Sequence, residues 1–211
     1  ITAALFVVYR PGKTDQVAEK KPAKPASDIA APAISKATIT LQNGSRIAID
    51  STNTGTMALL GKTAIQKTGQ GQILYTGNDA GILPEFNTLT NPRGSRVIQL
   101  ILSDGTKVWL NAETEIRYPV VFSGASREVE MNGEAYFEVA KDAAKPFMVK
   151  SNGVTVQVTG THFNVNAYKD EASLNVTLLE GAVKVSQANH TVDLAPGEQA
   201  QVSNSIKIDK Q

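Results

Sequence analysis

The two glutamates in the stretch GEAYFEVA are the side chains whose type and spacing could suggest acid–base chemistry. Glu134 and Glu138 lie in a stretch that alternates apolar and polar residues, which is typical of a β-strand. On a strand their carboxylates would share one face about 13 Å apart, because a strand rises about 3.3 Å per residue. The paired carboxylates of glycoside hydrolases stand about 5 to 9.5 Å apart, so this spacing is too wide. We therefore expect both glutamates to face solvent, with Ala135, Phe137 and Val139 turned inward.

Other kinds of reaction find no support in the composition. The chain has no cysteine, which excludes disulfides, thiolate zinc sites and cysteine nucleophiles, and it has only two histidines, His162 and His190. The stretch GKTAI at Gly61 lacks the earlier glycine of a phosphate-binding loop, and no nucleophile elbow is present. A net charge of +1 gives no basic surplus for nucleic acid. We expect a protein that is not an enzyme, with no metal, no cofactor and no nucleic-acid partner.

Trp109 is the candidate binding residue. In the stretch KVWLN, alternation places Lys107, Trp109 and Asn111 on one face of a strand and Val108 and Leu110 on the other. Because tryptophan is enriched among the residues that dominate protein interfaces, this face is a candidate partner surface. A tryptophan packed under a loop is the commoner arrangement, and we favour it here.

Short strands must position these residues. From Lys36 onward no convincing amphipathic helix of more than two turns is found, whereas many short stretches alternate apolar and polar residues between Gly, Asn, Asp or Pro. The fold is therefore predicted to be all-β, with many short strands. The stretch ITLQNGSRIAID at 39–50 has the same layout as LILSDGTKVWLN at 100–111. The Asn-Gly and Asp-Gly pairs in these stretches each predict a two-residue hairpin turn.

The repeated unit bears on the architecture. Gly160 and Gly181 precede strands in looser copies of the setting around Gly44 and Gly105. Short strands joined by glycine corners predict a stacked β-roll or solenoid, in which each rung buries its face on the next. A β-sandwich shares most of these signals, and the repeat period is not constant. Both architectures therefore stay open.

The first 35 residues have a different composition. Residues 1–9 are apolar or small apart from Thr2, and we expect them to end a transmembrane helix, which needs about 20 apolar residues. Tyr9 and Arg10 would then lie at the headgroup level. A signal-peptide core and a short edge strand are the alternatives. Residues 10–35 are rich in Lys, Ala and Pro and are expected to form an extended linker.

A family resemblance is carried by stretches spread from Asn87 to Ser203. They resemble, in the same order, the periplasmic region of FecR-like anti-sigma regulators, especially the form abundant in Bacteroidetes. The resemblance implies that residues 92–211 form a FecR-like periplasmic β domain and that residues 36–91 form the N-terminal β segment that precedes it. The matching stretches are FNTLTNPRGSR, LILSDGTKVWLNAETEIRYPVVFSG, REVEMNGEAYFEVAKDAAKPFMV, VQVTGTHFNVNAY, VTLLEGAVKV and LAPGEQAQV.

The resemblance also implies a function. It predicts a single-pass inner-membrane protein, anchored by the N-terminal helix, with most of this chain in the periplasm. Such a protein relays a signal from the signalling domain of an outer-membrane TonB-dependent transporter to an extracytoplasmic-function sigma factor. A cytoplasmic sigma-binding helix bundle is implied upstream, and a small α/β domain downstream.

Two other functions compete with the relay. One is an extracytoplasmic carbohydrate-binding or adhesion β domain, which would need an aromatic platform, whereas the single tryptophan and the five tyrosines are scattered along the chain. The other is a structural spacer in an envelope complex.

The resemblance singles out one bond, Gly160-Thr161, as a candidate for single-turnover self-cleavage, because some FecR-like proteins are cut at a Gly-Thr in this region. A threonine hydroxyl can attack the preceding carbonyl, and glycine leaves that carbonyl accessible. His162 is one conceivable proton carrier, but on a strand it would point to the opposite face from Thr161. A glycine corner followed by a β-branched strand residue is the reading that we favour.

Overall fold

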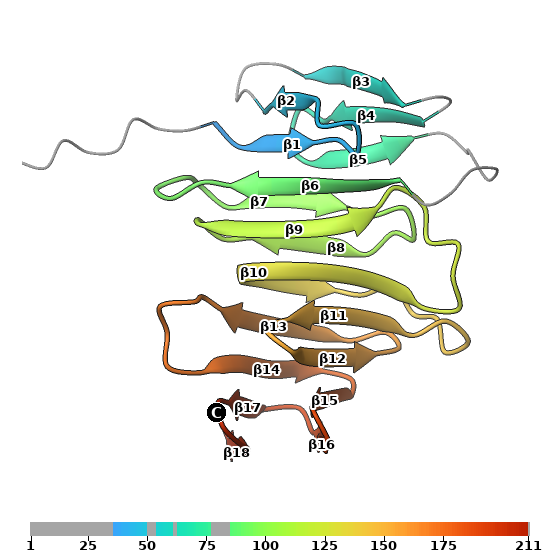
Figure 1. The fold of residues 1–211 in the computed structure, drawn as a ribbon. Helices are drawn as coiled ribbons and strands as arrows, with labels where there is room; N and C mark the ends of the chain where they lie inside the picture. The colour runs from blue at the N-terminus through green and yellow to red at the C-terminus, as the bar shows by residue number, and fades with distance from the viewer. Residues whose placement is uncertain (1–35, 50–53, 61–62, 77–84, 211) are drawn as a thin grey trace, which may run out of the picture. The chain divides into compact units, whose positions relative to one another are not determined.

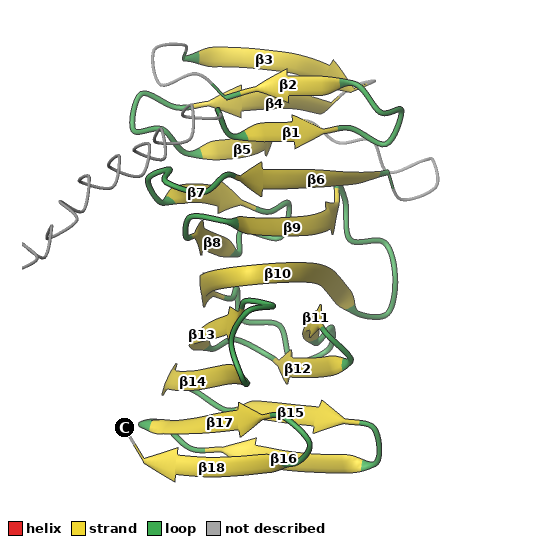
Figure 2. Cartoon of the chain, turned by 60° about the vertical axis from the view of Figure 1, so that its left-hand side comes forward, coloured by secondary structure: helices red, strands yellow, loops and turns green. Residues whose placement is uncertain are grey.

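The computed structural model describes residues 36–49, 54–60, 63–76 and 85–210, and all regular structure within these ranges is β-strand. Figure 2 accordingly shows strands and loops throughout the described chain. The all-β prediction is confirmed. No described residue belongs to a helix long and apolar enough to cross a membrane. The expected helix end and linker, at 1–35, lie outside the described residues.

The strands are short, and in most of them buried side chains alternate with partly buried or exposed ones. Their bounds, in chain order, are β1 (Thr38–Thr40), β2 (Arg46–Ala48), β3 (Gly55–Leu60), β4 (Thr63–Lys67), β5 (Ile73–Thr76), β6 (Phe86–Asn91), β7 (Ile98–Ile101), β8 (Lys107–Leu110), β9 (Thr114–Pro119), β10 (Arg127–Glu138), β11 (Phe147–Ser151), β12 (Val154–Val158), β13 (His162–Ala167), β14 (Leu174–Glu180), β15 (Val183–Gln187), β16 (His190–Leu194), β17 (Glu198–Val202) and β18 (Ile206–Lys210).

The strands build two stacked sheets that share β10. The first sheet has the hydrogen-bonded order β2-β1-β6-β9-β10-β11-β12-β15-β16. The second has the order β3-β4-β5-β7-β8-β10-β13-β14-β17-β18. Successive hairpins alternate between the sheets, so the strands stack in levels along the unit (Figure 1). The result is a stacked β-roll whose two sheets enclose one core, as in a sandwich.

The core lies between the sheets because the apolar positions of each strand face the opposite sheet. Val108, Leu110 and Phe137 of the second sheet are fully buried, as are Leu89 and Val149 of the first. Aromatic rings fill the centre, where Phe137 stacks on Phe163 with ring centroids 5.0 Å apart. Burial of large apolar side chains is the main favourable term in such a fold.

Strand β10 joins the two sheets. Residues 127–132 pair with β9 and β11 in the first sheet, and residues 133–138 pair with β8 and β13 in the second. The transfer occurs at Gly133, whose φ is 92°. A Cβ there would lie 2.6 Å from the carbonyl oxygen of Glu113 and 2.7 Å from the Cα of Thr114. Only glycine fits this crossing, because both its φ and its surroundings exclude a side chain.

The repeated turn is present in both copies, but it is not the two-residue turn that the sequence suggested. In each copy a three-residue loop closes the hairpin. The residue before the loop donates its N–H to the carbonyl of the residue after it, as Leu102 does to Thr106. The glycine, Gly44 or Gly105, has φ of 82° or 84°, which is typical of a type I turn followed by a left-handed residue. A third copy at 68–72 closes the hairpin between β4 and β5.

Gly160 and Gly181 have another role. Gly160 lies between β12 of the first sheet and β13 of the second, and Gly181 lies between β14 and β15. They are corners that carry the chain from one sheet to the other, so they are not looser copies of the hairpin turn. Residue 91 is the expected boundary between the N-terminal β segment and the FecR-like β domain. The first sheet continues across this boundary, since β6 bonds to both β1 and β9.

Candidate functional site

The outer face of the second sheet brings Trp109 and Tyr136 together. The two residues are directly opposite in the register of β8 and β10. Their ring centroids are 5.3 Å apart, with planes inclined by 44°, and both side chains are partly buried. Burial, together with the Glu138 and Glu180 carboxylates, raises the pKa of the Tyr136 phenol. The structure thus pairs two aromatic residues that lie 27 positions apart in the sequence, and a neighbouring strand supplies a ring for Trp109 to contact.

The aromatic pair is part of a row that crosses the second sheet. Each member lies directly opposite the next in the strand registers, so the side chains follow one line perpendicular to the strands. The flanking members carry amide or hydroxyl groups and no formal charge. In order from β7 to β17 the row is Gln99, Trp109, Tyr136, Asn164, Thr177 and Gln199, and we call it the amide-aromatic row.

The glutamates of β10 face outward, as expected. Ala135, Phe137 and Val139 between and beside them are buried. Glu134 accepts hydrogen bonds from the Asn111 amide at 2.8 Å and the Asn164 amide at 3.0 Å, and Glu138 pairs with Lys107 at 3.3 Å. The glutamates therefore orient neighbouring side chains.

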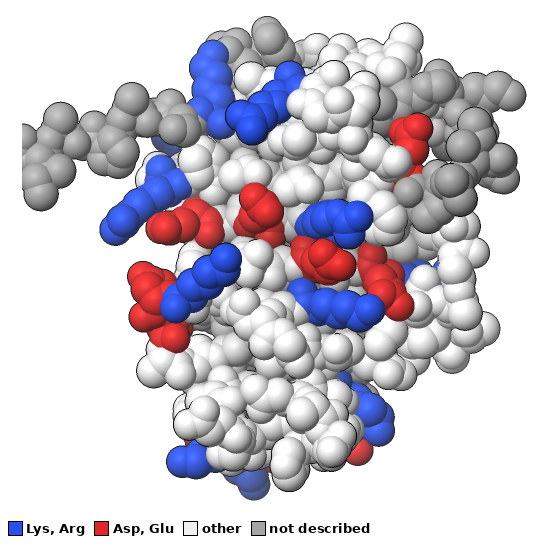
Figure 3. Space-filling model, viewed as in Figure 1, with Lys and Arg blue, Asp and Glu red and all other residues white. Residues whose placement is uncertain are grey.

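The outer face of the first sheet has a different chemistry. Arg117 lies 3.6 Å from Glu130, Lys150 lies 2.6 Å from Glu128, and the Arg117 guanidinium also covers the Phe86 ring. Figure 3 shows basic and acidic side chains alternating across this face. Such exposed pairs each contribute at most about 1 kcal/mol.

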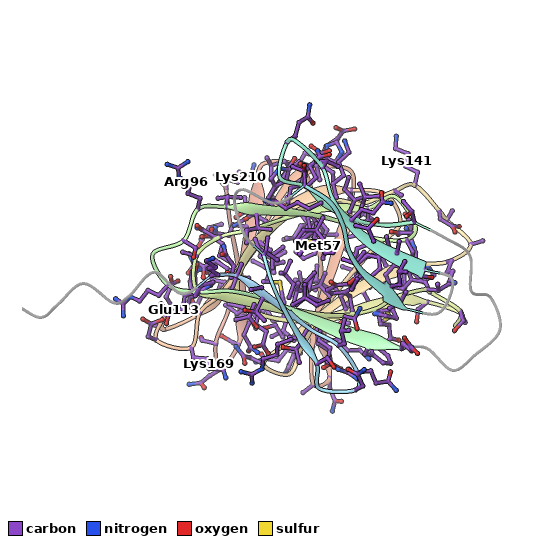
Figure 4. The ribbon with its side chains drawn as sticks, turned by 90° about the horizontal axis from the view of Figure 1, so that it is seen from above. Met57, Arg96, Glu113, Lys141, Lys169 and Lys210 are labelled. Atoms are coloured by element: carbon purple, nitrogen blue, oxygen red, sulfur yellow. The ribbon has the colours of Figure 1, made fainter. Side chains whose placement is uncertain are left out.

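Charged side chains also surround the stack at its rim. Seen along the stack, Arg96, Glu113, Lys141 and Lys169 extend outward (Figure 4). Within the described ranges, no three His, Asp or Glu side chains come close enough to hold a metal ion.

A hollow of ≈ 420 Å³ opens on the first sheet where β10 leaves it. Of its charged walls, Arg117 is paired with Glu130 and Lys150 with Glu128, and Met131 and Val154 reach it from the core side. Its lining consists of Glu115, Arg117, Glu130, Met131, Asn132, Lys150, Ser151, Asn152, Gly153, Val154 and Thr155.

The Gly160-Thr161 bond lies at a tight corner. The Thr161 side chain is 3% exposed, and its hydroxyl donates a hydrogen bond to the Ala182 carbonyl at 2.9 Å. His162 faces outward, with its Nδ1 atom 3.1 Å from a Glu180 carboxylate oxygen. The hydroxyl is thus directed at an acceptor that cannot remove its proton. Self-cleavage of this bond stays a prediction.

A buried ion pair escaped the sequence reasoning. Arg127 is 2% exposed, and its Nη1 atom donates to Asp104 at 2.7 Å and to the Ala140 carbonyl at 2.8 Å. Asp104 also accepts from the N–H and hydroxyl of Thr106. One sequence feature could have pointed to this ion pair. The repeated turn has a charged Asp104 in its second copy, where the first copy has the neutral Asn43.

Comparisons with known proteins match the central part of the chain. Residues 88–184 match the family model described as FecR protein. This central region is FecR-like. The matched region runs from β6 into β15, so it contains the repeated turn at Asp104-Gly105, the crossing strand β10 and the aromatic pair.

Solved structures agree with this FecR-like assignment. Two crystal structures of a putative anti-sigma factor from Parabacteroides distasonis ATCC 8503, at 2.50 Å and 1.65 Å resolution, are similar to the chain. The first has 37% identity and a TM-score of 0.58, and the match covers 60% of this chain and 60% of that one. The second has 38% identity and a TM-score of 0.57, and covers 59% of each. This chain therefore spans about three fifths of the length of those proteins. No curated protein matches it.

Proposed function

We propose that this chain is the extracytoplasmic part of a membrane-anchored anti-sigma regulator. It relays a signal from an outer-membrane TonB-dependent transporter to an extracytoplasmic-function sigma factor. The observation that carries the proposal is the FecR match over residues 88–184, joined to 37% and 38% identity with two solved chains described as an anti-sigma factor.

The sequence before residue 36 supports the same layout. Residues 1–9 provide apolar side chains for the end of a membrane helix, and the prolines and lysines of 10–35 suit an extended spacer. The proposed location is the inner membrane, with residues 36–211 in the periplasm. In the FecR-like unit, strands far apart in the sequence are hydrogen-bonded to each other. Such a unit is expected to be rigid, and a rigid unit transmits a contact better than a flexible tether does.

Recovery of a sigma factor tests the proposal. The full-length protein, purified from detergent-solubilised envelopes of its own cells, should bring down an extracytoplasmic-function sigma factor. Purification of a version that lacks residues 36–210 should also recover it, since sigma binding is assigned to the cytoplasmic side. A sigma factor that is absent under every signal state would refute the proposal.

A reporter for the sigma factor separates a relay from a spacer. Exchange of residues 36–210 for an unrelated β domain of similar length should abolish the response to the inducing signal. A spacer would tolerate this exchange, so an unchanged response would contradict the relay.

Topology is tested in the full-length protein with reporters fused after Lys36. Alkaline phosphatase, which is active only outside the cytoplasm, should be active there. Activity of a reporter that works only in the cytoplasm, such as β-galactosidase, would place this region on the wrong side of the membrane.

A further inference from the structure

We propose that the amide-aromatic row on the second sheet binds a neutral oligosaccharide, with Trp109 and Tyr136 as the stacking platform. This activity is separate from the relay, because it requires neither the membrane nor a sigma factor. The proposal rests on three features of the row: the ring pair, the hydrogen-bonding groups beside it, and the absence of formal charge along its length.

The ring pair provides the platform. Trp109 and Tyr136 are partly buried on an outer sheet face, with centroids 5.3 Å apart, so each ring is fixed by its neighbour yet keeps some exposed surface. The face of an aromatic ring carries partial negative charge and attracts the C–H groups of an apolar surface. A pyranose ring presents such C–H groups on one face and hydroxyls around its edge.

Hydrogen-bonding groups flank the rings on both sides. The Asn164 amide donates to Glu134, which turns its Oδ1 acceptor away from that carboxylate. On the other side, Gln99 accepts from the Gln72 amide at 2.7 Å, which directs its own Nε2 donor elsewhere. The platform thus has an oriented acceptor at one end and an oriented donor at the other, as hydroxyl groups require.

Length and charge narrow the ligand class. Five steps between neighbouring strands give the row a length of about 24 Å, which suits a short oligosaccharide better than one sugar ring. A phosphorylated or acidic ligand would meet the Glu134 carboxylate beside the row, whose hydrogen-bond donors are neutral amides, whereas Glu138 is paired with Lys107. A protein surface would gain more from aliphatic neighbours than from the amides that flank this pair.

The single tryptophan makes a direct test available. Because Trp109 is the only tryptophan of the 211-residue chain, fluorescence excited at a wavelength that tyrosine does not absorb reports on this site alone. We would titrate the chain with cellohexaose, maltohexaose, xylohexaose, mannohexaose and chitohexaose. At least one should give a saturable change in Trp109 emission, and Tyr136→Ala should weaken that binding about tenfold, which corresponds to about 1.4 kcal/mol.

Two further variants keep the result interpretable. Asn164→Ala should also weaken binding, whereas Arg117→Ala, on the outer face of the first sheet, should leave it unchanged. Circular dichroism and thermal melting would show that each variant is folded. No saturable change with any of the five sugars would overturn the proposal, as would binding that survives both Tyr136→Ala and Asn164→Ala. A photo-crosslinker at position 136 that captures a protein, with no sugar bound, would assign the face to protein docking instead.

Discussion

At the scale of single residues, the direction of a side chain relative to the core decides what its removal costs. Phe137 and Tyr136 are neighbours on β10 and face opposite ways. Phe137 is fully buried and stacks on Phe163, while Tyr136 lies on the outer face against Trp109. This pair of positions allows a comparison within one strand.

Phe137→Ala should lower the free energy of unfolding by about 3 to 5 kcal/mol, because it leaves a cavity in the core, and Leu110→Ala should lower it by about 2 to 5 kcal/mol. Tyr136→Ala should lower it by about 1 kcal/mol or less, since only a cross-strand contact is lost. Urea unfolding measures all three values. A similar loss at positions 136 and 137 would mean that the two faces of β10 are assigned wrongly.

Asp104 neutralises the buried charge of Arg127. Asp104→Ala should lower the free energy of unfolding by about 3 to 5 kcal/mol, because the charge of Arg127 would stay buried without its carboxylate. Asn43 is the matched control, since its Oδ1 accepts the Ser45 N–H in the same turn, without an arginine. Asn43→Ala should therefore lower it by only about 0.5 to 1.5 kcal/mol.

The double variant Asp104→Ala/Arg127→Met tests the physical cause. Removal of both charges should restore part of the stability lost in Asp104→Ala, because no unpaired charge is then left in the core. Equal stability of the single and double variants would show that the turn, and not the ion pair, accounts for the loss.

At the scale of elements, a pair of tyrosines links the two sheets. The hydroxyl of Tyr75, on β5 of the second sheet, lies 2.7 Å from that of Tyr118, on β9 of the first. The Asn87 amide donates to Tyr75 at 3.0 Å. Burial raises the pKa of both phenols, and for Tyr118, which is 1% exposed, it does so strongly, with Tyr75 adding to the effect.

These raised pKa values predict loss of stability in alkali. Above the ordinary tyrosine pKa of 10.0, the unfolded chain releases the Tyr118 proton while the folded chain keeps it. The free energy of unfolding should then fall as pH rises, by up to about 1.4 kcal/mol per pH unit for each such group. Below pH 10 this contribution is constant.

Tyr118→Phe tests the assignment. Near neutral pH it should lower the free energy of unfolding by about 1 kcal/mol, because a hydrogen bond is lost. Above pH 10 it should make the fall of that free energy with pH less steep. Tyr168→Phe, which removes a hydroxyl that donates to the Ala112 carbonyl, is the comparison: burial raises the pKa of Tyr168 as well, but less than that of Tyr118, so this variant should reduce the slope less. Unfolding curves from pH 8 to 11.5 would measure both. A slope above pH 10 identical to that of the wild type would contradict the role of Tyr118.

At the scale of the whole molecule, the central strands are bonded on both sides and the outer strands on one. Strand β10 bonds to β8, β9, β11 and β13, whereas β2, β3, β16 and β18 each lie at an edge of a sheet. Opening an edge strand breaks the hydrogen bonds to one neighbouring strand, whereas opening β10 breaks those to four strands.

Hydrogen exchange measured by mass spectrometry should therefore show the slowest exchange in β10 and in the strands next to it. The rate should rise toward β2 and β3 at one end and toward β16 and β18 at the other. Peptides from β1 and β6 should exchange in one cooperative unit with β9, because β6 bonds to both β1 and β9. Two separate unfolding transitions, divided near residue 91, would instead support an independent N-terminal segment.

Local patterns in the sequence predicted the secondary structure and the direction of many side chains. Alternation in KVWLN and GEAYFEVA placed Val108, Leu110 and Phe137 inward, and the structure confirms this. The Asn-Gly and Asp-Gly pairs identified the repeated hairpins, although their loops contain three residues and not two. These features follow from the two-residue period of a strand and from the φ that glycine permits, and both are local properties.

Only the tertiary structure decided which strands are neighbours. Trp109 meets Tyr136 because β8 pairs with β10, and Arg127 reaches Asp104 because the start of β10 passes the β7–β8 turn. The alternation of a strand fixes which face a side chain occupies, but any strand of suitable length can supply the bonded partner. The choice of partner depends on packing of the whole core, so the amide-aromatic row and the buried ion pair could not be derived from the sequence alone.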